Sequence, residues 1–144
     1  MTTTAASRIE LKIPSRPEFI CVARLAVAAA ASRMGFNYDD IEDLKVATGE
    51  ALTNAIQHAQ TEGREGDEDI VVMCTLGAEA MVIEVQDRGS GFDPGRRQQM
   101  LAQDELQEGG LGLLLIEALV DEVEFRAEPG TGTVVRMTKH LAAP

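Results

Sequence analysis

Five stretches of the chain have the alternation or the β-branched composition of strands. They are residues 8–13, 69–76, 81–86, 121–126 and 131–138. Residues 77–79 form a tight connection between the second and third stretches, which predicts an antiparallel hairpin.

Three further stretches predict helices. The first runs from Ser15 to about Met34, with Ser15 as N-cap and Glu18 three residues on, and Gly35 ends it. The second opens with acidic residues after Asn37, and its core stripe is Ile41, Leu44, Thr48, Leu52, Ala55 and Ala59. The third is amphipathic, with its stripe at Leu111, Leu114, Leu115, Ala118 and Leu119.

The order of these elements predicts an α+β fold, a two-layer α/β sandwich with helices on one face of a mainly antiparallel sheet. A chain of 144 residues suits a single domain over residues 1–144. Residues 93–108 are polar and begin with helix breakers, so we expect a mobile segment there and a candidate lid.

Composition narrows the function. The net charge of −11 argues against direct nucleic-acid binding, which needs clustered Lys and Arg. No run of about 18 apolar residues and no signal peptide is visible, so we expect a cytoplasmic protein without a membrane segment. Cys21 and Cys74 lack metal-ligand spacing, and we expect two buried free thiols.

Asp87 follows the strand at 81–86 and begins the motif Asp87-x-Gly89-x-Gly91. Glycine lets the backbone approach a ligand closely, and a carboxylate can accept a hydrogen bond from an exocyclic amine such as that of adenine. An ordinary turn at a strand end gives the same pattern, and the motif alone leaves both interpretations open.

Glu50, Asn54 and His58 are four residues apart and therefore share one flank of the second helix. An amide oxygen from Asn54 suits Mg²⁺, and a carboxylate at Glu50 suits proton acceptance near a γ-phosphate. The alternatives are a polar residue at a helix edge and a solvated glutamate. His58 fits a supporting or structural role better than that of a phosphoacceptor.

Gly109 and Gly110 precede the third helix, where free backbone N–H groups favour a phosphate. Neither a Walker loop nor a dinucleotide fingerprint is present. A glycine hinge is the alternative.

Together, Glu50-x-x-x-Asn54, Asp87-x-Gly-x-Gly91 and Gly109-Gly-Leu-Gly-Leu113 resemble the N box and the two glycine boxes of the GHKL ATPases. Within that superfamily the chain is similar to the RsbW-type anti-sigma factors, over nearly its whole length. The stretches that carry this similarity include Ala31–Gly35, Asp40–Lys45, Gln57–Ala59, Glu108–Leu113 and Met137–Lys139.

The resemblance implies a Bergerat fold that binds ATP and Mg²⁺, phosphorylates a serine of a STAS-domain anti-sigma antagonist, inhibits a stress-type sigma factor and forms homodimers. It implies Glu50 as catalytic base, Asn54 as Mg²⁺ ligand, Asp87 as adenine contact, and Arg24 as a possible sigma contact. The remaining residues around the nucleotide would be His58, Gly89, Gly91, Gly109, Gly110, Leu111, Gly112 and Leu113.

The main alternative is a non-catalytic, nucleotide-dependent binding module of the same fold, in a stressosome or a sigma partner switch. A detached histidine-kinase ATPase domain is a weaker alternative, because no dimerising phosphoacceptor helix is visible in the sequence.

Overall fold

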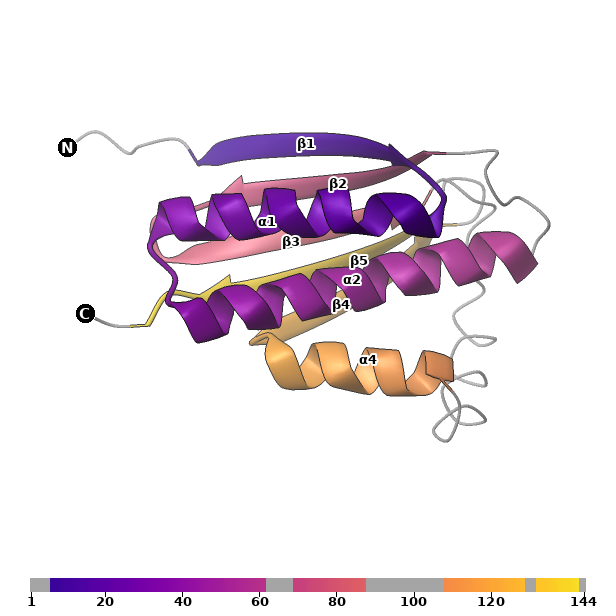
Figure 1. Cartoon of the computed structure of the whole chain (residues 1–144). Helices are drawn as coiled ribbons and strands as arrows, with labels where there is room; N and C mark the ends of the chain where they lie inside the picture. The colour runs from indigo at the N-terminus through magenta and orange to yellow at the C-terminus, as the bar shows by residue number, and fades with distance from the viewer. Residues whose placement is uncertain (1–5, 62–68, 88–107, 129–131, 143–144) are drawn as a thin grey trace.

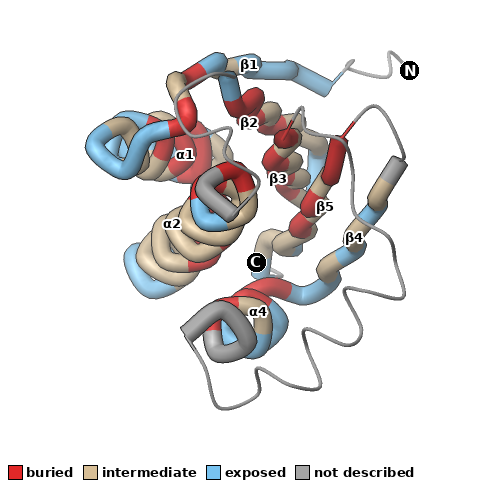
Figure 2. The backbone as a smooth tube through the Cα atoms, turned by 90° about the vertical axis from the view of Figure 1, so that its right-hand side faces the viewer, coloured by how far each residue is buried: buried red, intermediate tan, exposed pale blue. Residues whose placement is uncertain are grey.

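The elements form two layers (Figures 1 and 2). A computed structural model of the chain describes residues 6–61, 69–87, 108–128 and 132–142. One layer holds the helices α1 (Ile20–Met34), α2 (Tyr38–Thr61) and α4 (Glu108–Leu119). All three cover the same face of the sheet, and α2 lies between α1 and α4 and packs against both.

The other layer is a five-stranded sheet in the order β1-β2-β3-β5-β4. Every neighbouring pair is antiparallel, which confirms the predicted α+β class. β5 lies between β3 and β4, so the residues that end β3 face the beginning of β5. The strands are β1 (Ser7–Pro14), β2 (Asp69–Leu76), β3 (Ala80–Asp87), β4 (Glu122–Glu128) and β5 (Gly132–His140).

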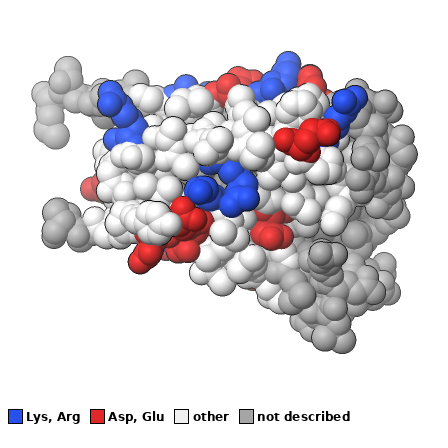
Figure 3. All heavy atoms as spheres, viewed as in Figure 1, with Lys and Arg blue, Asp and Glu red and all other residues white. Residues whose placement is uncertain are grey.

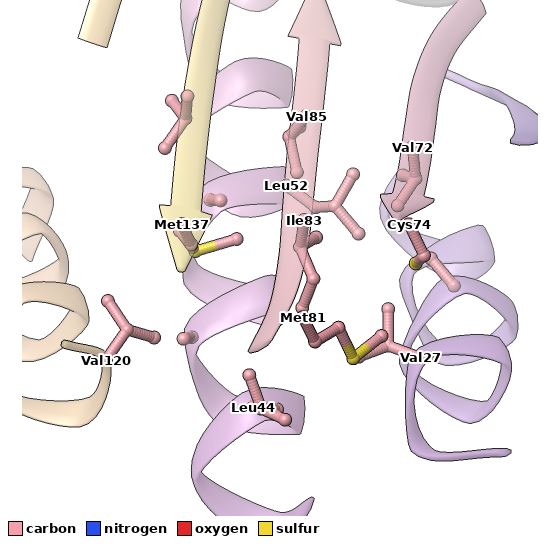
Figure 4. Packing of buried hydrophobic residues seen from close by; sticks show 14 of the residues in the cluster. Val27, Leu44, Leu52, Val72, Cys74, Met81, Ile83, Val85, Val120 and Met137 are labelled. Carbon is pink, nitrogen blue, oxygen red and sulfur yellow. The ribbon is translucent and has the colours of Figure 1, made fainter. Parts of the chain in front are cut away.

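The core lies between the layers. In Figure 4, Leu44 and Leu52 of α2 point towards the buried face of β3, where Met81 and Ile83 are fully enclosed. Cys74 of β2 belongs to this core, and burial raises the pKa of its thiol to about 11. Both cysteines are free, but Cys21 is exposed on α1, so the prediction of two buried thiols was wrong for that residue.

The first helix begins later than predicted. A short 3₁₀ helix at Pro17–Phe19 precedes α1, and no side chain caps either element. Ser15 is buried and its hydroxyl has no hydrogen-bond partner, so its assignment as N-cap was wrong. The predicted end is confirmed: Gly35 adopts φ 96°, a left-handed conformation in which glycine carries no Cβ penalty.

The third helix, α4, buries a different face from the one predicted. Leu114 and Leu115 are 50% and 39% exposed, whereas Gly112, Ile116 and Val120 are buried. The predicted stripe was therefore wrong at Leu114, Leu115 and Ala118, whereas Leu119 packs against the core as predicted. Almost every position of this helix is apolar, so its sequence does not select one face. None of the helices in the described part of the chain is long and apolar enough to cross a membrane.

Candidate active site

Glu50 and Asn54 meet the beginning of α4. A Cβ atom built at Gly112 would lie 2.8 Å from Glu50 Oε2 and 3.5 Å from Asn54 Oδ1. Only a residue without a side chain leaves room for both groups, so Gly112 sets how closely α4 approaches this flank of α2. The motif Glu50-x-x-x-Asn54 and the glycine motif at residues 109–113 are more than fifty residues apart in sequence. In the structure they form one surface.

The Asn54 amide is incompletely satisfied. Its Nδ2 atom is buried and has no hydrogen-bond partner. An unsatisfied buried donor costs about 1–3 kcal/mol, and the Nδ2 group can offset that cost by donating to a ligand acceptor such as a phosphate oxygen. A carboxylate and an amide beside a helix beginning are groups that suit a magnesium-bound phosphate, and the predicted use of ATP with Mg²⁺ fits these residues.

His58 and Asp87 join the end of α2 to the end of β3. The His58 Nδ1 atom lies 3.2 Å from Asp87 Oδ2, and the two side chains are 11% and 8% exposed. The sequence placed His58 beside the nucleotide; in the structure it contacts the residue expected to bind adenine. The Asp87 motif and the helix motif therefore meet in space as well.

Thr133 is a candidate site residue that the sequence did not reveal. It is the register partner of Asp87 on β5, it is buried, and its hydroxyl has no hydrogen-bond partner. A threonine within a strand looks like ordinary β propensity. Only the pairing of β3 with β5 shows that Thr133 lies opposite Asp87 on the neighbouring strand.

The glycine motifs are described in part. Gly89 and Gly91, with most of the candidate lid at 93–108, lie outside the described residues. α4 begins at Glu108, so Gly109 and Gly110 lie within its first turn and not in a hinge before it. Leu111 also belongs to that turn, where backbone N–H groups lack intrahelical partners. Leu113 is partly buried and packs against the core.

Arg24 lies on α1 beside this site. A Cβ atom at Gly49, the residue before Glu50, would be 3.3 Å from Arg24 Cδ. The Arg24 Nε atom is buried and has no hydrogen-bond partner. Figure 3, which looks onto α1 and α2, shows basic side chains in the middle of this face with acidic side chains to either side. Val22 and Leu25, which lie within two residues of Arg24 in the sequence of α1, are exposed.

The family model of the histidine kinase-like ATPase domain matches residues 13–139. The chain belongs to that family. Serine-protein kinase RsbW of Bacillus velezensis is 42% identical over 96% of this chain and 89% of its own length. RsbW of Bacillus subtilis is 43% identical over 94% of this chain and 87% of its own length. RsbW of Listeria monocytogenes is 39% identical over 96% of this chain and 90% of its own length. These relatives confirm the predicted enzyme class, a serine-protein kinase of the RsbW type.

Two solved structures share the fold. The RsbU and RsbW domains of a Mycobacterium tuberculosis protein superpose with a TM-score of 0.69 at 22% identity, covering 96% of this chain and 33% of that one. A chain of the SiaB–SiaC complex from Pseudomonas aeruginosa superposes with a TM-score of 0.69 at 14% identity, covering 90% of this chain and 88% of that one.

Proposed function

We propose that this kinase uses Mg-ATP to phosphorylate a serine of a STAS-domain anti-sigma antagonist, and that in a separate complex it holds a stress-type sigma factor inactive. Phosphorylation of the antagonist would then leave the kinase available to the sigma factor. Both partners are proteins, which agrees with the acidic charge of the chain and needs no contact with nucleic acid.

One observation carries the kinase half of this proposal. The three motifs of the sequence, distant along the chain, meet at one end of the molecule: Glu50 and Asn54 against Gly112, and His58 on Asp87. The same end also holds the Nδ2 atom of Asn54 and the hydroxyl of Thr133, which are both buried without a hydrogen-bond partner.

The residues suit separate tasks. Glu50 would accept the proton of the target serine hydroxyl. The serine oxygen would then bond to the γ-phosphorus, and ADP would leave. The amide oxygen of Asn54 would hold Mg²⁺, which would offset the phosphate charge when bound. Asp87 and the Thr133 hydroxyl recognise the base. The first turn of α4, which includes Gly109 and Gly110, offers backbone N–H groups to phosphate.

The same proposal places the protein partner near α1. Arg24, with its buried unsatisfied Nε atom and its exposed apolar neighbours Val22 and Leu25, is our candidate contact for the sigma factor. Because Arg24 packs against Gly49, a partner on α1 would lie close to Glu50. We further propose that the kinase works as a homodimer in the cytoplasm, as the resemblance to its family implies.

Glu50→Gln tests the kinase half, because it removes the base and keeps the shape of the side chain. We expect serine phosphorylation of a STAS-domain substrate to fall by about 10²–10⁴-fold. ATP affinity, measured by calorimetry, should change little. The phosphoserine is quantified by mass spectrometry, and an unchanged rate in the variant would remove Glu50 from the mechanism.

The alternative is a binding module of the same fold that uses nucleotide only to choose its partner. The buried, unsatisfied Nε atom of Arg24 beside the nucleotide site favours some such coupling. Wild-type protein that binds Mg-ATP and the sigma factor, but forms no phosphoserine on any STAS partner, would favour this module over the kinase.

A further inference from the structure

The contact between His58 and Asp87 connects two elements that are 29 residues apart. His58 lies one turn beyond Asn54 on α2, and Asp87 is the last residue of β3. Both side chains are almost enclosed, with 11% and 8% exposed. The bond of 3.2 Å therefore forms in a region where water competes poorly for the carboxylate.

The chemistry of the two groups fixes the direction of this bond. A carboxylate only accepts hydrogen bonds, so His58 Nδ1 must carry the proton that is shared with Asp87 Oδ2. The terminal torsion of an aspartate is soft, and a fixed partner on one oxygen holds the carboxylate plane. A carboxylate has about four acceptor positions, so more than one donor can share it.

We propose that His58 is the positioning residue for Asp87: its Nδ1–H group orients the carboxylate so that it selects adenine by the exocyclic amine. This inference rests on the proposed function, because it takes Asp87 as the contact to the base. His58 itself does not touch the nucleotide in this account. It sets base selectivity through the Asp87 side chain, whereas Glu50 and Asn54 act at the phosphate end.

The test compares ATP with inosine triphosphate, in which an oxygen replaces the exocyclic amine. Wild-type protein should bind ATP at least about tenfold more tightly, since a hydrogen bond to a charged group is lost in the analogue. His58→Gln keeps the approximate size but carries its amide one atom further out, near the position of Nε2. We expect this variant to lose at least about threefold of the ATP preference, with the affinity for inosine triphosphate unchanged.

His58→Asn is the matched rescue, because its amide nitrogen lies close to the position of Nδ1. It should restore the preference that His58→Gln loses. Thermal melts of both variants separate folding from recognition. Equal losses of affinity for both nucleotides, or an unchanged preference in His58→Gln, would overturn the positioning role.

A second measurement needs no nucleotide. The chain has two histidines, so ¹⁵N chemical shifts of the imidazole rings are simple to assign, and the other ring, His140, is exposed. His58 should carry its proton on Nδ1, and Asp87→Asn should change that ring pattern. A proton on Nε2 alone would contradict the inference. Wild-type protein that binds neither nucleotide would instead refute the proposed function, whatever the ring pattern.

Discussion

The two ends of α2 differ in how their polar side chains are satisfied. At the beginning of the helix, Asn37 Oδ1 accepts the N–H of Asp40 at 2.8 Å. Asp40 and Asp43 lie 3.8 and 3.7 Å from Lys139 Nζ, which donates to the Leu119 carbonyl at 2.7 Å. These groups join α2 to the end of α4 and to β5. They satisfy one another by hydrogen bonds and ion pairs within the chain.

Further along the same helix the Asn54 amide is not fully satisfied. Glu50 and Asn54 lie against Gly112, and the Asn54 Nδ2 atom is buried without a partner. The difference fits a helix that supports the fold at its beginning and, in the proposed function, binds a ligand further along. Variants at the two ends should therefore affect different measurements, and the predictions below use that separation.

Among the variants that separate the two ends of α2, Gly112→Ala should give the largest effect. The added Cβ would approach Glu50 Oε2 to 2.8 Å, and the flexible end of the Glu50 side chain would move away. Displacing a catalytic group by about 1 Å can cost roughly 100-fold, and we expect a loss of that size in the rate of serine phosphorylation. The melting temperature should stay close to that of wild type, because the side chain and not the backbone yields.

Ala118→Ser, on the exposed side of the same helix, is the control for general effects on α4 and should leave the rate unchanged. A wild-type rate in Gly112→Ala would show that the close approach of α4 to Glu50 does not matter for the reaction.

Lys139→Met should lower the stability of the fold and leave nucleotide binding unchanged. The change removes a charged hydrogen bond to Leu119 and leaves Asp40 and Asp43 without their shared cation. We expect the free energy of unfolding in urea to fall by about 2 kcal/mol, with ATP affinity unchanged. Lys45→Met is the matched control: its ion pair with Glu42 is partly exposed, so the loss should stay below about 1 kcal/mol. A larger effect of Lys139→Met on ATP affinity than on unfolding would mean that the two ends are not separate.

The sequence predicted best those features whose cause lies within a few residues. Gly35 ends α1 because of its own backbone freedom, and Glu50 and Asn54 share a helix flank because of helix geometry alone. Both features depend on the local sequence alone and need no contact with distant parts of the chain. The same holds for the hairpin of β2 and β3, which a short connection determines.

Features that depend on packing were missed or wrong. The sequence around α4 is apolar at nearly every position, and the fit of Gly112 against α2 determines which face is buried. Ser15 looked like a cap because its neighbours fit a capping box, yet the chain enters α1 through a 3₁₀ turn. Thr133 became visible only through the register of β5 with β3.

The smallest predicted effects come from two buried threonines whose hydroxyls have no partner, Thr48 in the core and Thr133 beside Asp87. Valine at either position removes an unsatisfied hydroxyl and should raise the free energy of unfolding by roughly 1 kcal/mol. Only Thr133→Val should also weaken ATP binding, by about three- to tenfold, the contribution of one neutral hydrogen bond. Calorimetry and urea titration of the two variants measure both quantities. Equal ATP affinities in Thr48→Val and Thr133→Val would assign the Thr133 hydroxyl to the fold, as Thr48 is, and would limit the base contact to Asp87.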